Sequence, residues 1–136
     1  MKIEIIGNPI AQTRARIFKN RFYDPQYKVK KNFRDAVLDQ LTKIDYDFSH
    51  IHEPVKLKLD FIFSMPKSWS KKKREKKNQM PHTNQIDIDN LQKFFFDTCN
   101  ELLWLDDRQI WNVHATKTWG EEGKTILEII ETEENQ

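Results

Sequence analysis

Apolar and polar residues alternate along four stretches of the chain with the period of two that is typical of a β-strand. The clearest is "PVKLKLDFIFSMP" (54–66), where every odd position from 55 to 63 is apolar and the lysines and aspartate between them face the other way. The stretches "KIEIIG" (2–7), "QIWNVHATKTW" (109–119) and "KTILEII" (124–130) have the same character. We therefore expect four strands, the last two joined by the turn "GEEG".

Two other stretches have the spacing of a helix. Phe33, Val37 and Leu41 recur at intervals of four, which predicts a helix that begins near Lys28. A second helix is expected from about Asp89 to Leu102, with its core face formed by Leu91, Phe95, Thr98 and Leu102. The order β-α-β-α-β-β predicts a single α+β domain over residues 1–136, with the helices packed on a mixed sheet. Residues 131–136 are expected to form a disordered acidic tail.

Two segments have no apolar periodicity, and both are basic. Residues 8–26 have prolines at both ends and predict a long loop or a loose hairpin. Its aromatic residues Phe18, Phe22 and Tyr23 are suited to stacking on or wedging between bases, although packing against the domain is the simpler interpretation. Residues 67–85 are rich in lysine and have the character of a solvated loop, although their position directly before Asp87 and Asp89 favours phosphate contact.

Composition and charge narrow the function. The chain has 136 residues, 12% of them aromatic, a single Cys99 that we read as a core residue, and no apolar run of about 20 residues that could span a membrane. The N-terminus is too short and too interrupted for a signal peptide, so we expect a cytoplasmic protein. Residues 1–77 contain 19 Lys and Arg against 9 Asp and Glu, whereas residues 78–136 contain 4 against 12. This asymmetry predicts a basic surface for a polyanion beside an acidic site.

The acidic site is expected around the second helix. Asp87 and Asp89 share a face if the chain is extended there, so we place the start of the helix at Asp89 and Asp87 on the extended segment before it. Lys93 follows one turn later and Asp97 one turn after that. Asp106 and Asp107 lie between this helix and the third long strand.

Converging carboxylates without His or Cys nearby are the ligands that Mg²⁺ and Mn²⁺ prefer. A lysine beside them suits phosphodiester chemistry, because it can stabilise charge in the transition state. The spacing also allows a structural interpretation, in which Asp89 caps the helix and "DDRQ" (106–109) is an ordinary turn. The residues alone leave both interpretations open.

Basic side chains near this site are candidate phosphate contacts. His82 precedes the site and is either a substrate-facing residue or a loop residue without function, while His50 and His52 are interpreted as loop residues without a functional role. The candidate DNA-binding residues are Arg14, Arg16, Arg21, Lys67, Lys71, Lys72, Lys73, Arg74, Lys76 and Lys77.

The segment "IDIDNLQKFFFDTCNELLWLDDRQI" (86–110) resembles the signature of the RusA family of Holliday-junction resolvases, D-x-D-N-L-x-K followed by D and then D-D-x-Q-[IV]. The segments "GNPIAQTRARIFKNRFYDPQ" (7–26) and "FSMPKSWSKKKREKKNQMPHTNQIDIDN" (63–90) resemble the N-terminal part of the family and its basic approach to the site. The chain departs from the family at Gln12, where lysine is common, and at "LLW" (102–104), where a small residue often marks the turn.

The resemblance implies a Mg²⁺-dependent endodeoxyribonuclease, with Mn²⁺ able to substitute, that resolves four-way DNA junctions by paired nicks in recombination and repair. It implies that Asp87, Asp89 and Asp107 bind the metal, that Lys93 supports cleavage, and that Asn90, Asp97 and Asp106 orient the site. The family often has a lysine at the position of Lys117, so the resemblance also makes Lys117 a candidate DNA-binding residue. It further implies a homodimer in a bacterial or phage setting, because paired nicks need two active sites. The alternatives are a nuclease for flaps, forks or other branched DNA, and a junction-binding protein that does not cut.

Overall fold

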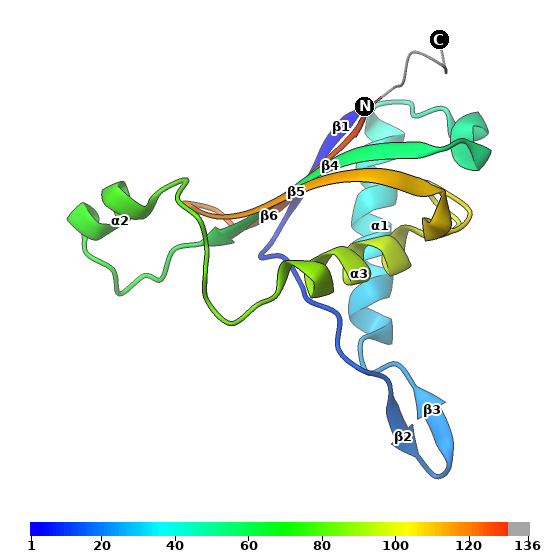
Figure 1. The fold of residues 1–136 in the computed structure, drawn as a ribbon, viewed down its shortest axis with the longest axis horizontal. Coiled ribbons are helices and arrows are strands. Elements are labelled where there is room, and N and C mark those ends of the chain that lie inside the picture. The colour runs from blue at the N-terminus through cyan, green and yellow to red at the C-terminus, as the bar shows by residue number, and fades with distance from the viewer. Residues whose placement is uncertain (131–136) are drawn as a thin grey trace.

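The four alternating stretches form one mixed sheet in the computed structural model, which describes residues 1–130 (Figure 1). The strands are β1 (Lys2–Ile6), β4 (Val55–Ser64), β5 (Ile110–Gly120) and β6 (Lys124–Ile130). Their order in the sheet is β1-β6-β4-β5, with β4 and β5 parallel and the other pairs antiparallel. The predicted α+β class and mixed sheet are confirmed.

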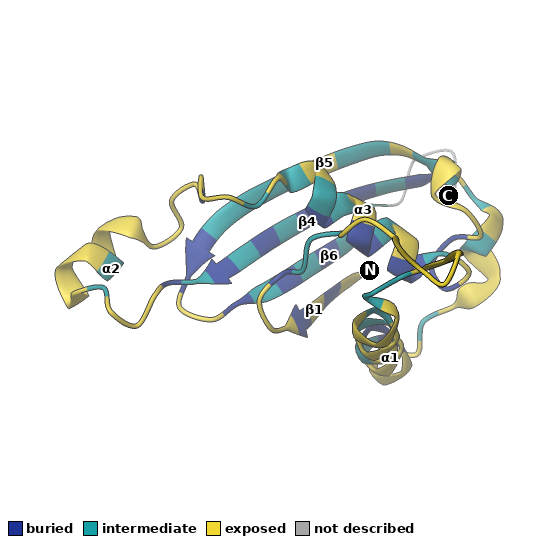
Figure 2. Cartoon of the chain, turned by 90° about the horizontal axis from the view of Figure 1, so that it is seen from below, coloured by how far each residue is buried: buried dark blue, intermediate teal, exposed yellow. Residues whose placement is uncertain are grey.

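The register places the apolar side chains of neighbouring strands on the same face of the sheet. Leu59 of β4 lies opposite Ala115 of β5 and Leu127 of β6, and both leucines are fully buried. Buried and less buried positions alternate along the strands, and the helices cover one face only (Figure 2). Each fully buried aliphatic side chain contributes about 1.5–3 kcal/mol to folding, so this face holds the sheet and helices together.

Two helices supply the other half of the core. Helix α1 (Tyr27–Lys43) begins one residue before the predicted position and buries Val37 and Leu41. Helix α3 (Ile88–Cys99) buries Leu91 and Phe95, and the ring of Phe33 from α1 packs edge-on against Phe95 at 5.9 Å. These contacts fix α3 against both the sheet and α1.

The predicted end of α3 at Leu102 is wrong, because the backbone leaves the helix at Asn100. The Asn100 side chain accepts a hydrogen bond from Trp104 Nε1 at 2.9 Å, and the Arg34 guanidinium donates to the Thr98 and Asn100 carbonyls. Leu102 is nevertheless buried. Leu102 lies in a turn that follows the helix, but its side chain fills the same part of the core, so its position in the sequence fits the helical spacing.

The two basic segments without periodicity have different structures. The N-terminal one was expected to be a long loop or a loose hairpin and forms a hairpin, with strands β2 (Arg16–Phe18) and β3 (Arg21–Tyr23). The lysine-rich one was expected to be a loop but contains helix α2 (Lys71–Lys77), whose first turn is capped by Ser70 Oγ accepting from Lys73 N–H. Lysine is a good helix former, and α2 has no buried residue, so it has no apolar stripe to reveal it.

Three further observations bear on the sequence predictions. The rings of Phe18, Phe22 and Tyr23 are exposed, so the interpretation that they pack against the domain is wrong. The predicted tail at 131–136 lies outside the described residues. Within residues 1–130, no helix is both long and apolar enough to cross a bilayer.

Candidate functional site

The first turn of α3 presents two carboxylates that the fold does not use. Asp87 occupies the N-cap position with an extended backbone, as predicted, but its side chain makes no capping hydrogen bond. Asp89 lies inside the first turn, so the interpretation that it caps the helix is wrong. Lys93 Nζ lies 3.9 Å from Asp89 Oδ2, and both side chains are about two-thirds exposed. An exposed pair of this kind contributes little to stability, which leaves these groups available for another role.

The two aspartates after α3 have different roles. Asp106 accepts a hydrogen bond from Arg108 N–H at 2.9 Å, and the Gln109 side chain accepts one from Asp106 N–H, which together cap the 3₁₀ turn η2 (Asp107–Gln109). The Arg108 N–H lowers the pKa of Asp106. Asp106 is therefore a structural residue of the turn, whereas Asp107 is not part of the capping box.

Asp107 lies in a region of excess negative charge. Partial burial raises its pKa, and so do a hydrogen bond with Asp106 and the negative charges of Asp106 and Asp97. Neighbouring negative charges that raise the pKa of a carboxyl in this way would also attract a cation to it. Asp97, one turn beyond Lys93, is the α3 residue whose negative charge raises the pKa of Asp107.

Helix α3 separates the two halves of the predicted site. Asp87 stands at its start and Asp107 follows its end, and twelve helical residues rise about 18 Å. Figure 1 shows the chain running from the start of α3 to its far end before it turns into β5. Within residues 1–130, no three His, Cys, Asp or Glu side chains are grouped so that they could hold a metal ion. The donors suit Mg²⁺ or Mn²⁺ in chemistry, since all are carboxylate oxygens, but a single chain does not bring them together.

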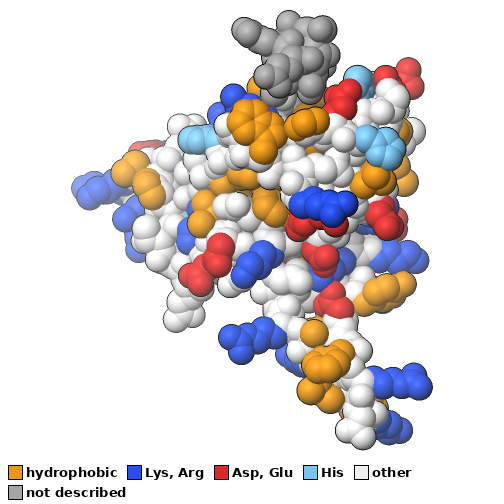
Figure 3. Space-filling model, turned by 45° about the vertical axis from the view of Figure 1, so that its right-hand side comes forward, with side chains coloured by type: hydrophobic (Ala, Val, Ile, Leu, Met, Phe, Trp, Pro, Cys, Tyr) orange, Lys and Arg blue, Asp and Glu red, His pale blue; other side chains and the backbone are white. Residues whose placement is uncertain are grey.

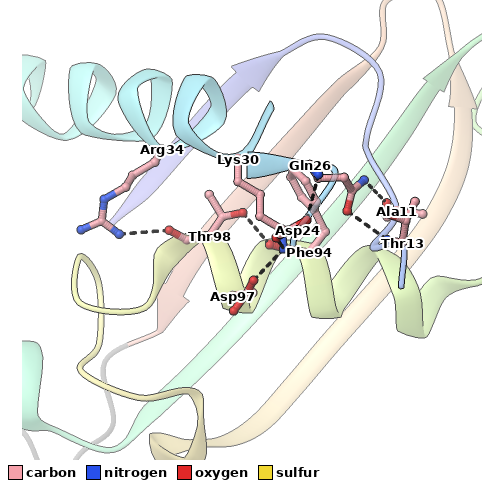
Figure 4. A network of polar contacts seen from close by, with 9 residues as sticks. All are labelled: Ala11, Thr13, Asp24, Gln26, Lys30, Arg34, Phe94, Asp97 and Thr98. Atoms are coloured by element: carbon pink, nitrogen blue, oxygen red, sulfur yellow. Dashed lines mark hydrogen bonds and ion pairs between the residues drawn. The ribbon is translucent and has the colours of Figure 1, made fainter. Parts of the chain in front are cut away.

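A polar network connects the root of the hairpin to α3 (Figure 4). Lys30 of α1 donates to Asp24 at 2.5 Å and to Asp97 at 2.8 Å. Burial opposes the charge of Lys30, yet these two hydrogen bonds raise its pKa overall, and Lys30 in turn lowers the pKa of Asp24. Sequence reasoning missed Lys30, because its two partners are far apart along the chain. Asp97 is thus paired with Lys30. Asn90, another of the three predicted orienting residues, accepts the Gln12 N–H at its backbone carbonyl oxygen.

Some predicted DNA contacts are engaged within the chain. The Lys117 ammonium donates to the backbone carbonyls of Ile86 and Asn84, directly before Asp87. Arg74 donates to the Pro66 carbonyl and pairs with Glu121 at 3.1 Å. In these positions Lys117 supports the segment that carries Asp87, and Arg74 attaches α2 to the sheet end.

The remaining basic candidates are exposed and form two groups. Arg14, Arg16 and Arg21 lie on the hairpin or just before it. The second group, on and before α2, consists of Lys67, Lys71, Lys72, Lys73, Lys76 and Lys77. Lys73 lies over the ring of Trp69 at 4.4 Å, which adds a cation–π contact to this group.

His82 is a core residue, which the sequence did not reveal. Its ring is stacked on Phe63 at 4.3 Å and packs against Trp119 at 4.2 Å, and its Nδ1 is buried without a hydrogen-bond partner among the described residues. Burial and the charge of Lys117 lower its pKa. Cys99 is fully buried, as predicted, and burial raises the pKa of its thiol.

Comparisons with known proteins identify the family to which the chain belongs. The family model of the endodeoxyribonuclease RusA matches residues 7–130, which is nearly the whole described chain. The chain is also 29% identical over 136 residues to a Bacillus subtilis (strain 168) protein named uncharacterized protein YqaN, and the match covers 96% of each chain.

The chain belongs to the RusA endodeoxyribonuclease family. It is therefore an enzyme of the class that hydrolyses phosphodiester bonds within DNA, and nucleases of this family depend on a metal ion.

Proposed function

We propose that this protein is a Mg²⁺-dependent homodimeric endonuclease that resolves four-way DNA junctions by paired symmetric nicks. The observation that supports this most is that Asp87, Asp89 and Asp107 are exposed carboxylates without a capping role in the fold, in a chain of the RusA family. Such activity would serve DNA recombination and repair in the cytoplasm of a bacterium or of a phage-infected cell.

Asp87, Asp89 and Asp107 are the residues that would hold the ion, with Mn²⁺ able to replace Mg²⁺. A divalent ion held by these carboxylates would supply an activated water molecule as the nucleophile. Lys93, one turn from Asp89, would face the scissile phosphate and stabilise its growing negative charge. Asp106 would keep the turn η2 in place, and Asn90 would keep the start of α3 in place. Asp97 would fix α3 against α1 through its contact with Lys30.

The separation along α3 supports a site shared between two chains. A metal ion binds oxygen ligands at about 2.0–2.6 Å, which is far less than the rise of α3. We therefore infer that Asp87, Asp89 and Lys93 of one protomer meet Asp107 of the partner subunit. A two-fold dimer would then have two such sites, as two symmetric nicks require.

The exposed basic groups would hold the DNA outside the site. The lysines of α2 and those before it would bind phosphates on one arm, and Arg14, Arg16 and Arg21 would bind phosphates near the hairpin. Arg74 and Lys117 would contribute more to positioning, given their contacts within the chain.

A cleavage assay tests the proposal. We expect a synthetic four-way junction to receive paired nicks at symmetric positions in Mg²⁺ and to remain intact in EDTA. Asymmetric cutting of flaps or forks in preference to junctions would identify a different branched-DNA nuclease. Retarded but intact DNA in Mg²⁺ would contradict the proposal and indicate a junction-binding protein.

A further inference from the structure

The β2–β3 hairpin is an arm that projects from the body of the protein (Figure 1). It turns through Lys19 and Asn20, both with positive φ (48° and 62°), as a two-residue type I′ turn requires. Every residue from Thr13 to Tyr23 is exposed. The arm has only two strands and no core of its own, so packing within the arm does not explain its exposed apolar residues.

The register gives the tip an aromatic ring on each side. Ile17 lies directly opposite Phe22, so these two side chains share one face of the ribbon. Phe18 lies opposite Arg21 on the other face. The rings of Phe18 and Phe22 are 65% and 78% exposed. The arm therefore has the shape of a wedge with an apolar ring on both faces.

The charge of the arm identifies the kind of partner. Arg14, Arg16, Lys19 and Arg21 interleave with the aromatic residues, and no Asp or Glu occurs between Thr13 and Tyr23. Figure 3 shows hydrophobic and basic side chains together on this projection. A partner that offers flat apolar surfaces and regularly spaced negative charge is DNA with unstacked bases. The same arm of a second copy would be repelled by its like charge.

Both roots of the arm are fixed to α3. Before the arm, Gln12 N–H donates to the Asn90 carbonyl at 2.9 Å, and after it Asp24 is bridged through Lys30 to Asp97. The Gln26 side chain joins the two roots, since it accepts from Thr13 N–H at 2.9 Å and donates to the Ala11 carbonyl at 2.8 Å (Figure 4). The arm is thus held in a defined position relative to the helix that carries Asp89 and Lys93.

We propose that this arm inserts where DNA arms meet and stacks unpaired bases on Phe18 and Phe22, while its arginines bind the adjacent phosphates. The arm then selects branched over continuous DNA. This inference rests on the proposed function, because it identifies what positions the substrate for the same site.

The test is binding in EDTA at fixed salt concentration, with 2-aminopurine at the branch point of a four-way junction. Wild-type protein should increase the 2-aminopurine fluorescence by unstacking the base. The double variant Phe18→Ala, Phe22→Ala should lose this increase and bind the junction at least about tenfold more weakly, because neither ring remains for a base to stack on. Its affinity for continuous duplex should change less than about twofold, since all basic residues remain.

Two variants control for general effects. Phe48→Ala removes an exposed ring from the 3₁₀ helix η1 (Phe48–His52), away from the arm, and should behave as wild type. Phe18→Trp, Phe22→Trp keeps the aromatic surface and should restore the fluorescence response.

Three results would separate the possible failures. If the alanine variant retains junction affinity and fluorescence while wild type cuts junctions in Mg²⁺, the wedge is wrong and the nuclease proposal stands. If wild type never cuts but the response depends on both rings, the wedge stands and the nuclease proposal fails. If the alanine variant becomes monomeric where wild type is a dimer, the arm contacts a second copy and the wedge is overturned.

Discussion

At the scale of single residues, some acidic side chains of this protein make contacts that stabilise the fold and others do not. Asp106 caps a turn and Asp97 pairs with Lys30, so both have structural partners. Asp87 has no capping bond, and Asp89 has only a long, exposed contact with Lys93. Substitution at Asp89 should therefore affect activity far more than stability.

Asp89→Asn tests this distinction. The variant should cut junctions at least about a hundredfold more slowly, because the metal has one carboxylate oxygen fewer to bind. It should bind junctions as well as wild type or better, since one charge that repels phosphate is removed. Gel retardation in EDTA and cleavage in Mg²⁺ measure the two effects, with the exposed α1 variant Asp35→Asn as control. Parallel loss of binding and cutting would count against the ligand role.

His82 gives a prediction for stability against pH. Because its pKa is lower in the folded chain than the usual value of about 6.5, the unfolded state binds more protons between the two values. Stability should be constant above about pH 7 and fall as the pH decreases toward the folded pKa. Urea midpoints from pH 7.5 to 5 should show this fall in wild type and less of it in His82→Phe, which keeps the ring stack. Equal slopes in the two proteins would contradict it, and the exposed His52→Gln serves as control.

At the scale of elements, the sequence pattern revealed those helices and strands that bury one of their faces in the core. The strand β4 alternates strictly, and α1 places Val37 and Leu41 one turn apart, so both were predictable. Helix α2 has no buried residue, so its sequence has no apolar periodicity from which a helix could be predicted. The end of α3 was misplaced because Leu102 continues the apolar spacing of the helix although it lies in the turn that follows. The hydrogen bond between Asn100 and Trp104 that forms this turn cannot be read from the spacing.

The role of α2 can be tested through salt dependence. Replacing Lys71, Lys72 and Lys73 with Gln should weaken binding and reduce the slope of log affinity against log salt by about 0.9 for each phosphate that the protein no longer neutralises. A matched removal of charge at Lys2, Lys43 and Lys56, which lie on other elements, should leave the slope nearly unchanged. Equal reductions in both triple variants would mean that α2 attracts DNA only through net charge.

At the scale of the whole molecule, the sequence motif indicated the ligands but not how they meet. The acidic residues follow one another closely along the chain and suggest one cluster, yet Asp87 and Asp107 stand on either side of a helix of about 18 Å. The predicted helix from Asp89 to Leu102 would itself rise about 21 Å, so a long separation was predictable. The surface through which a second chain could reach the site does not appear in any local pattern. Likewise, the link from the arm to α3 through Lys30 depends on residues 67 positions apart.

The most direct measurement of the shared site uses mixed dimers of two inactive variants, Asp89→Asn and Asp107→Asn, carrying different affinity tags and purified through both. If each site takes Asp89 from one chain and Asp107 from the other, one site of the mixed dimer keeps both aspartates. The mixed dimer should then nick a four-way junction on one strand in Mg²⁺, although neither variant cuts alone. Mixed dimers as inactive as the parent variants, beside wild-type dimers that cut, would place each site within a single chain and contradict the account.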